Sequence, residues 1–472
     1  MPSTTATQNA RAANNRHQAH NTEHRRPERP TQILDINVWG SGENSELGLG
    51  PRVTGAPKPR AQKLLQPYDI VQISAGGMHC AAVTDNGKVL TWGVNDDGAL
   101  GRVKPPDAPE EGPQDLLDPF ESTPGPVYFE YDLDIVQVAT TNSACFVLTS
   151  EGTVYGWGSF AVSPSSYLPS LRIPTNNPQG GDGNFGFLYD KPPQTTERHP
   201  VPIPGLNDIV ELAGGANHVL ALTHDGDVFA WGSGEQNELG RRLLARRRFE
   251  SLIPQRVGLP RHQTAKIFAG SHHSFAIDVH GKVWAFGLNN FGQCGVPTRE
   301  DTGFTTIISP TVVKSLEGHS IHHIACGLHH SLACTDEGKV LVWGRCDDGQ
   351  MGIDLNVVPH DDIIFDSRGR PRVLNVPTVV PGMFPSALSL SSKTNQPILV
   401  PSADSVAAGI DNCFAVSQGG GLVAWGFSAS YNTGLGTTDT VREPTEMRRS
   451  GSALTFVDAG GQFGISAGPR LR

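Results

Sequence analysis

The sequence predicts an all-β protein, a seven-bladed β-propeller closed by pairing of its N- and C-terminal strands in one blade. One observation is a short apolar strand that ends in an aromatic residue followed by Gly and recurs along the chain. A second is the half-unit small-Gly-x-x-His-Ser-x-Ala-φ-Thr-x-x-Gly-x-Val, where φ is apolar, which precedes every such strand but the first. Together they indicate an array of similar units. The seven aromatic residues are Trp39, Trp92, Trp157, Trp231, Phe286, Trp343 and Trp425.

Each unit begins with a predicted hairpin. Residues 218–222 and 227–231 are both rich in strand formers, and the HDG tripeptide between them is a turn signal. A second turn follows each aromatic-Gly pair, as in residues 289–295 and 346–352, and leads to the outer part of the unit. Each unit is therefore predicted to be a small antiparallel sheet, or blade.

Closure of the ring is predicted from the two ends of the array. The chain opens with an aromatic-Gly half at residues 35–48 and finishes with a lone first half at residues 459–466. Joining the two halves completes a seventh blade and leaves only short, protected strand edges. An open solenoid would need capping repeats, and the sequence contains none. One propeller domain is therefore predicted over residues 33–468.

The remaining segments are predicted to be irregular. Residues 1–32 should form a disordered tail with excess Arg, because the first thirty residues hold five Arg and two Glu but scarcely an apolar residue. Insertions near residues 102–134, 159–207 and 353–404 are rich in Pro, Gly, Ser and Asn and are poor strand formers. Loops of this kind on a rigid ring usually carry specificity.

Composition and charge bound the class of protein. Seven Cys without a CxxC pair predict reduced thiols, and no apolar run could span a membrane or serve as a signal peptide. We expect a soluble protein made in the cytosol, without a membrane partner. The net charge of −10 argues against a chain that coats nucleic acid over its whole surface. The candidate nucleic-acid contacts are Arg25 and Arg26 in the tail and Arg246, Arg247 and Arg248 in a loop.

Covalent catalysis and metal binding are not expected. No GxSxG, HExxH or P-loop pattern occurs, and turns account for the glycines. The sequence therefore predicts no cofactor and no small-molecule substrate. Pairs such as His329-His330 are adjacent in a strand, so their side chains point to opposite faces and cannot chelate one metal ion. The repeating histidines, among them His273 and His330, are predicted to bond to backbone or to a neighbouring blade.

The residues just before the repeating His occupy the same point of successive blades. A seven-fold ring should therefore gather them around one mouth of the central channel. These residues are Met78, Asn142, Ser143, Ala216, Asn217, His272, Leu328, His329, Asp411 and Gln462. Only Asp411 among them is a carboxylate, which argues against a hydrolytic site in the channel.

The unit AGxxHSxALTxxGxVxxWGxxxxGQLG resembles the repeat of the regulator of chromosome condensation family, and all seven units match it. The resemblance implies a guanine nucleotide exchange factor of the small GTPase Ran, located in the nucleus and bound to chromatin, either histones or DNA, through the tail. It also implies that the GTPase docks over the mouth just described. His329 matches a histidine that the family uses for exchange, and Asn142 and Asn217 replace two aspartates, so these three are the candidate catalytic residues.

The resemblance also implies a two-stranded wedge that presses on the GTPase. GWGSF at residues 156–160 matches its start, and GDGNFGF at residues 181–187 is similar to its returning end. The implied GTPase contacts are Glu43, Met78, Ser143, Phe160, Asp182, Asn184, Phe185, His272, Asp411, Gln462 and Phe463.

Two functions remain open on the sequence. One is exchange on a Ran-like GTPase, favoured by His329, Glu43 and the GWGSF start of the wedge. The alternative is a non-catalytic propeller scaffold that binds chromatin or another protein. The uncharged Asn142 and Asn217 favour the scaffold, as does Phe463, which stands where the other repeats have His.

Overall fold

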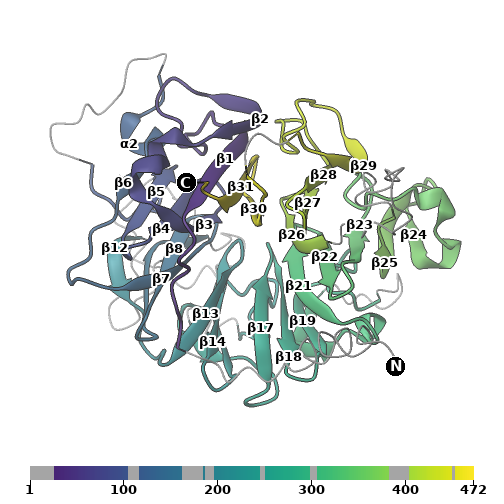
Figure 1. Ribbon diagram of the computed structural model, residues 1–472. Helices are drawn as coiled ribbons and strands as arrows, with labels where there is room; N and C mark the ends of the chain where they lie inside the picture. Colours follow the sequence, from purple (N-terminus) through teal and green to yellow (C-terminus); the bar gives the residue numbers. More distant parts are fainter. Residues whose placement is uncertain are drawn as a thin grey trace, which may run out of the picture.

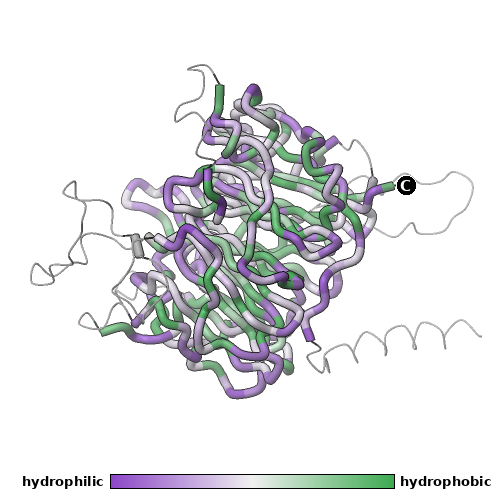
Figure 2. The backbone as a smooth tube through the Cα atoms, turned by 90° about the vertical axis from the view of Figure 1, so that its left-hand side faces the viewer, coloured by the Kyte–Doolittle hydropathy of each residue, from purple (hydrophilic) through white to green (hydrophobic). Residues whose placement is uncertain are grey.

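A computed structural model describes residues 26–104, 116–161, 184–185, 196–244, 250–297, 306–381, 403–448 and 452–471. The strands form seven antiparallel sheets of four or five strands around a central channel, and each sheet is one blade (Figure 1). The hydrophobic strands lie inside and the hydrophilic turns lie outside (Figure 2). The predicted seven-bladed propeller is therefore confirmed.

Four-stranded sheets make up blades 1 to 4, numbered in chain order. Blade 1 contains β3 (Ile70–Ala75), β4 (His79–Thr84), β5 (Val89–Gly93) and β6 (Gly125–Pro126). Blade 2 contains β7 (Ile135–Thr140), β8 (Ala144–Thr149), β9 (Val154–Gly158) and β12 (Glu197–Pro202). Blade 3 contains β13 (Ile209–Gly214), β14 (His218–Thr223), β15 (Val228–Gly232) and β16 (Gln255–Arg256). Blade 4 contains β17 (Thr264–Ala269), β18 (His273–Asp278), β19 (Val283–Leu288) and β20 (Thr306–Val312).

The other blades include the one that closes the ring. Blade 5 contains β21 (Ile321–Cys326), β22 (His330–Thr335), β23 (Val340–Arg345), β24 (Ile363–Phe365) and β25 (Pro371–Val379). Blade 6 contains β26 (Ala403–Ala408), β27 (Asn412–Ser417), β28 (Leu422–Gly426) and β29 (Val441–Glu446). Blade 7 contains β30 (Phe456–Ala459), β31 (Phe463–Pro469), β1 (Leu34–Ser41) and β2 (Gly55–Ala61). The short helices are η2 (Lys63–Tyr68), α2 (Pro119–Ser122), η5 (Lys314–Leu316), η6 (Leu355–Val357) and η7 (His360–Asp362).

Blade 7 joins the two ends of the chain. Strand β1 pairs with β31 without interruption, from Leu34 opposite Pro469 to Gly40 opposite Phe463. β31 in turn pairs with β30, and β1 with β2. The predicted closure is confirmed, and its physical reason is that each half-unit alone would expose an unpaired strand edge.

The three insertions are not irregular throughout. The described end of the second one supplies β12, the outer strand of blade 2, and the third supplies both β24 and β25 of blade 5. These strands contain prolines, such as Pro200 in β12 and Pro377 in β25, which made them look like loops. β12 is the edge strand of blade 2, and Pro377 lies in the part of β25 that pairs with β23 but not with β24, so in both places a missing backbone donor is tolerated.

The N-terminal tail lies outside the described residues up to residue 25, but its last part is placed. The Arg29 guanidinium forms an ion pair with the Asp134 carboxylate and donates a hydrogen bond of 3.2 Å to the backbone carbonyl of Ile135. Arg29, within the segment predicted to be a disordered tail, is thus attached to blade 2.

A repeated polar relay joins successive blades. At the junction of blades 4 and 5, the Ser331 hydroxyl donates to the backbone carbonyl of Gln293 at 2.8 Å. Because the only proton of the Ser331 hydroxyl is used in that bond, the hydroxyl oxygen accepts a second hydrogen bond, from Nε2–H of His273 at 2.7 Å. The Trp343 indole donates to the same carbonyl at 2.9 Å. The predicted structural role of the repeating His is confirmed at this junction.

Equivalent contacts recur at other junctions, with Ser or Cys as the middle member. They join His79 Nε2 to Cys145 Sγ at 3.2 Å, His218 Nε2 to Ser274 Oγ at 2.8 Å and His330 Nε2 to Cys413 Sγ at 3.1 Å. Burial lowers the pKa of His79 and His330 to about 4 and that of His218 to about 3. The relay histidines are therefore neutral at physiological pH.

We expect Ser331→Ala to lower the free energy of unfolding by about 1–3 kcal/mol, because it leaves the buried Nε2–H of His273 without an acceptor. Ser331→Cys should lose less, since Cys145 and Cys413 fill the same place in other relays. Urea unfolding followed by tryptophan fluorescence measures both variants. Equal midpoints for wild type and Ser331→Ala would show that the relay does not stabilise the fold.

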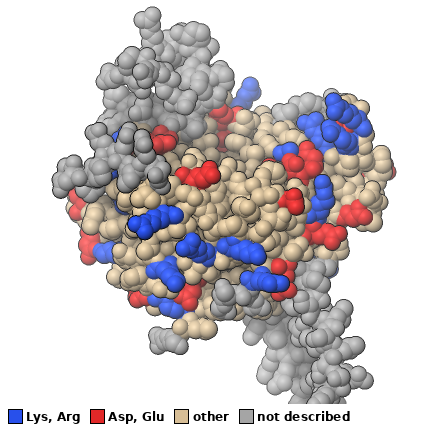
Figure 3. Space-filling view, turned by 90° about the horizontal axis from the view of Figure 1, so that it is seen from above, with Lys and Arg blue, Asp and Glu red and all other residues tan. Residues whose placement is uncertain are grey.

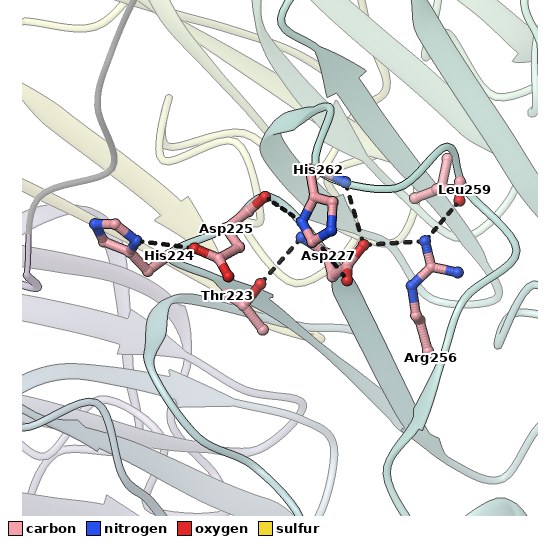
Figure 4. Close-up of polar contacts among 7 residues, drawn as sticks. All are labelled: Thr223, His224, Asp225, Asp227, Arg256, Leu259 and His262. Atoms are coloured by element: carbon pink, nitrogen blue, oxygen red, sulfur yellow. Dashed lines mark hydrogen bonds and ion pairs between the residues drawn. The ribbon is translucent and has the colours of Figure 1, made fainter.

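The hairpin turns of the blades lie at the end of the ring away from the mouth. In blade 3 the Asp227 carboxylate accepts from the Arg256 guanidinium at 2.9 Å and from the backbone N–H of His262 at 3.3 Å (Figure 4). The backbone N–H of Asp227 donates to the Thr223 hydroxyl at 3.0 Å. These bonds tie the blade 3 hairpin to the segment that leads into blade 4.

Candidate functional site

The turns between the first and second strands of the blades meet at one end of the channel. Backbone bonds join neighbouring turns there, from Asn142 N–H to the Ala216 carbonyl at 2.9 Å and from Gly461 N–H to the Gly77 carbonyl at 2.9 Å. The second of these bonds connects the last blade to the first. These backbone bonds show that the turns meet at a common mouth, as the sequence predicts.

The mouth opens into a cavity of about 540 Å³. Residues predicted for the GTPase surface that line it are Met78, Asn142, Ser143, Asn217, His272 and Gln462. His329 and Asp411 directly follow two further lining residues, Leu328 and Ile410, and lie beside the cavity on blades 5 and 6.

His329 is half-buried and lies against an aromatic ring. Its imidazole is 4.8 Å from the Phe291 ring, centroid to centroid, at an interplanar angle of 42°. Burial lowers the pKa of His329, the Arg345 guanidinium lowers it further, and the Asp411 carboxylate opposes both. The imidazole is therefore neutral at physiological pH. Its Nδ1 is buried and has no hydrogen-bond partner in the described chain, so only Nε2 is left to contact a docked partner.

Arg345 holds together the acidic residues around His329. Its guanidinium forms ion pairs with Asp347 and Asp348, each at 2.6 Å, and with Asp411 at 3.5 Å. The Gln350 amide also donates to the Asp411 carboxylate at 2.9 Å. Asp411 is thus fixed from two sides, and its position at the mouth is set by groups of blade 5.

Sequence reasoning did not identify Phe291 and Arg345 as part of this site. Both residues follow an aromatic-Gly pair. The repeat pattern predicts a turn at these positions but gives no indication that their side chains belong to a functional site. A signal was nevertheless present at Arg345, since the residue after the other pairs is uncharged, as at Val94, Ser159 and Phe427.

Two residues of the predicted GTPase surface are buried, and those predictions were wrong. Phe463 is 1% exposed and packs in the core of blades 7 and 1, because it occupies the place of the buried relay His. Phe160 is fully buried and stacks on Phe146, with ring centroids 5.8 Å apart. Neither side chain can reach a docked partner. By contrast, Glu43 is exposed.

The start and end of the predicted wedge pair with each other. Strand β10 (Phe160–Ala161) and β11 (Asn184–Phe185) form a separate two-stranded antiparallel ladder, with Phe160 opposite Phe185. Asp182 lies outside the described residues, and for Asn184 and Phe185 only the backbone is described. Their contacts with a GTPase stay predictions.

Of the predicted nucleic-acid contacts, Arg25, Arg246, Arg247 and Arg248 also lie outside the described residues. Arg26 lies at the other end of the channel, where it lines a cavity of about 1190 Å³ together with Glu211 and Lys266. The last part of the tail and the candidate docking mouth are therefore at opposite ends of the ring.

Comparison with known proteins decides the family. The sequence pattern of the RCC1-like domain matches residues 35–466. The chain belongs to the RCC1-like domain family. Protein pim1 of Schizosaccharomyces pombe is 36% identical over 94% of this chain and 76% of its own length. The guanine nucleotide exchange factor SRM1 of Saccharomyces cerevisiae is 34% identical, over 93% of this chain and 88% of its own.

Solved structures of the RCC1-like family agree with the fold. Prp20p from Saccharomyces cerevisiae, described with its binding to Gsp1p and histones, superposes with a TM-score of 0.77 at 33% identity, over 95% of this chain and 94% of its own. Yeast RCC1 bound to Kap60 superposes with a TM-score of 0.78 at 33% identity, over 96% of this chain and 92% of its own.

The His329-His330 pair of this RCC1-like chain is used in two directions. His330 bonds to Cys413 of the next blade, whereas His329 lies on Phe291. The described parts of the chain hold no group of three or more His, Cys, Asp or Glu side chains placed to bind a metal ion. They also contain no helix long and apolar enough to cross a membrane.

Proposed function

We propose that this chain is a guanine nucleotide exchange factor that binds a Ran-like GTPase over the mouth and promotes release of GDP. The observation that carries the proposal is that Asn142 and Asn217 line one opening, with His329 next to the lining residue Leu328, in a chain of this family. The relative named as an exchange factor and the neighbour described as binding Gsp1p support it.

Exchange of this kind makes no covalent bond. A factor that binds the nucleotide-free GTPase more tightly than the loaded one weakens nucleotide binding by the same factor, because the two equilibria are linked. Each tenfold loss of nucleotide affinity requires about 1.4 kcal/mol of that preference. Several polar contacts at the mouth and the β10–β11 wedge would supply it together.

Charge at the rim supports encounter with a basic partner surface. Glu43 and Asp96 are exposed in the turns of blades 7 and 1, and Asp347 and Asp348 extend the acidic rim on blade 5. Complementary potentials of this kind raise association rates and suppress partners of the wrong charge.

The proposal includes a nuclear location and contact with chromatin through the Arg-rich tail. The solved relative described as binding histones supports the chromatin contact. Because residues 26–29 lie at the end of the ring opposite the mouth, chromatin contact and GTPase docking would not compete for the same surface. A scaffold that binds partners without exchange activity is the alternative, favoured by the neutral Asn142 and Asn217.

We expect substoichiometric amounts of the full chain to accelerate release of fluorescent GDP from Ran, with turnover over many GTPase molecules. A GTPase of another class, such as Ras, should show no acceleration. If release from Ran is unchanged while the chain still binds nucleotide-free Ran, the exchange proposal fails and the scaffold stands. Failure to bind Ran at all would also remove the mouth as a Ran-docking surface.

A further inference from the structure

The imidazole of His329 is not oriented by a hydrogen bond within the described chain. Its Nδ1 is buried without a partner, and the groups that act on the imidazole do so through burial and charge. The neighbouring His330 differs, because its Nε2 bonds to Cys413 of the next blade. The last torsion of a histidine side chain has broad minima, so burial alone leaves the ring free to turn. Another contact must therefore fix the ring of His329.

The ring that packs against His329 is that of Phe291, in the turn after β19 of blade 4. The two centroids are 4.8 Å apart at an interplanar angle of 42°. Phe291 is half-buried, but the apolar core between blades 4 and 5 does not include it. Core packing therefore does not account for this side chain.

Turn chemistry does not account for Phe291 either. It is the fifth residue after the aromatic residue of its repeat, and a polar residue suits such a turn. Five of the other six repeats have a polar residue at this place, namely Asn44, Asp97, Gln236, Asp348 and Ser430. The aromatic exception stands in the blade that precedes His329.

The turn that carries Phe291 is bonded to the strand that follows His329. The backbone N–H of Phe291 donates to Oε1 of the fully buried Gln293 at 2.8 Å. The Gln293 carbonyl accepts from the hydroxyl of Ser331, two residues after His329, at 2.8 Å. These short links hold Phe291 at a constant position relative to the imidazole.

Two guanidinium groups of blade 5 lie over the Phe291 ring. The guanidinium carbon of Arg372, on β25, is 5.1 Å from the ring centroid, and that of Arg345 is 5.9 Å from it. Cations at such distances are attracted to the face of an aromatic ring. β25 also lies close to the turn, since a Cβ on Gly292 would be 3.6 Å from Val373 Cγ1. The third insertion, which supplies β24 and β25, thus reaches the site through Phe291.

Arg372 has no other charge partner within the described chain. Lys and Arg side chains lie beside Asp and Glu side chains on the side of the molecule that carries β24 and β25 in Figure 1 (Figure 3). Arg370, for example, forms an ion pair with Asp366 at 2.7 Å. Arg372 lies over Phe291 instead, and its carbonyl accepts from the backbone N–H of Cys346 at 3.1 Å.

We propose that Phe291 is the positioning residue of His329, and that Arg372 of the third insertion holds Phe291 in place. The inference rests on the proposed exchange function, which gives His329 its role. Phe291 keeps the imidazole in one orientation, with Nε2 available to a docked GTPase, so that less ordering is needed when the partner binds.

The first test needs no GTPase. With isotope-labelled histidine, NMR of the full-length chain follows the titration of each ring, and the signal of His329 is identified by its loss in His329→Ala. In Phe291→Leu the pKa of His329 should rise toward its ordinary value, because burial lowers it in the wild type. Phe291→Tyr keeps a ring and should keep the wild-type pKa. Both variants retain the other titratable and charged groups that act on His329, namely Arg345, Asp347, Asp411, His272 and His330.

The second test measures GDP release from Ran. Phe291→Leu should lower kcat/KM by about threefold to tenfold, whereas Phe291→Tyr should stay near the wild type. In the His329→Ala background Phe291→Leu should cause no further loss, because Phe291 acts through the imidazole. Losses that multiply in the double variant would overturn the proposal. If the wild type does not accelerate GDP release, the proposed function fails, while the titration still decides whether Phe291 positions His329.

Two more variants complete the titration test. Arg372→Gln should shift the His329 signal in the wild type but not in Phe291→Leu, where a direct effect of the cation would persist. The control Phe129→Leu removes another half-buried ring, which packs on Trp157 with centroids 6.1 Å apart, and should leave the signal unchanged. A wild-type pKa of His329 in Phe291→Leu, or an equal shift in Phe129→Leu, would overturn the role of Phe291. An unshifted signal in Arg372→Gln would overturn that of Arg372.

Discussion

Replacing His329 with alanine is expected to lower kcat/KM for GDP release from Ran by about tenfold to a hundredfold, a loss of roughly 1.4–2.8 kcal/mol of transition-state stabilisation. The imidazole is neutral, lies on Phe291 and stands beside the cavity shared by the other blades. Its loss removes a pre-oriented ring whose Nε2 can hydrogen-bond to the GTPase, since Nδ1 is buried. Stopped-flow release of fluorescent GDP at several Ran concentrations measures kcat and KM separately.

Two further variants make this result specific. His199→Ala removes an exposed histidine from β12, on the outer side of blade 2, and should leave GDP release unchanged. Arg345→Met keeps His329 but removes the cation that fixes Asp411, so kcat/KM should fall less than in His329→Ala. The pKa of His329 should rise in Arg345→Met, because the guanidinium lowers it in the wild type. Wild-type kinetics in His329→Ala would remove this residue from the proposed site.

Replacing Glu238 with glutamine is expected to stabilise the protein at pH 8 and not at pH 4. Glu238 is 1% exposed, and burial raises its pKa from 4.5 to about 7. Since the folded-state pKa lies above the unfolded one, ionisation opposes folding increasingly from about pH 4.5 to pH 7 and by a constant amount above it. Each pH unit between the two pKa values corresponds to about 1.4 kcal/mol, so the wild type loses about 3 kcal/mol at pH 8.

Glutamine should keep the hydrogen bond that Glu238 makes. The Glu238 carboxylate accepts from the backbone N–H of Gln236 at 2.7 Å. Gln293 and Gln350 occupy the same place in later blades and accept the equivalent bonds at 2.8 and 2.9 Å. Urea unfolding at the two pH values gives the difference, with the exposed Glu151→Gln as a control that should show none. A Glu238→Gln variant no more stable than wild type at pH 8 would contradict the assigned cost of burying this carboxylate.

Much of the fold could be predicted because the repeat encodes local and neighbouring contacts together. His273 and Ser331 are members of the same motif in successive blades, and their contact joins those blades. The motif therefore specifies both a strand and its connection to the next unit. Blade 7 follows from the same argument. The incomplete halves at the two chain ends each have an unpaired strand edge, and these two edges pair with each other.

The outer parts of the blades were harder to predict. Strands β12 and β25 lie in segments whose prolines and length indicated loops, and only packing on the preceding strand makes them extended. Propensity is a weak guide here because pairing with a neighbouring strand is sufficient, on one side for β12 and on both sides for the first part of β25. The burial of Phe160 likewise depends on Phe146, which belongs to β8 of blade 2 and not to the β10–β11 ladder.

The sequence by itself determined the number of blades, the closure of the ring and the set of turns that share one mouth, since these follow from periodicity and chain order. Only the tertiary structure decided which of those residues face the mouth and what holds them. Phe463 is withdrawn into the core, whereas Arg345 and Phe291 are brought beside His329 from separate turns. Side-chain direction and long-range charge pairing depend on residues distant in the chain, and a local repeat pattern carries no information about them.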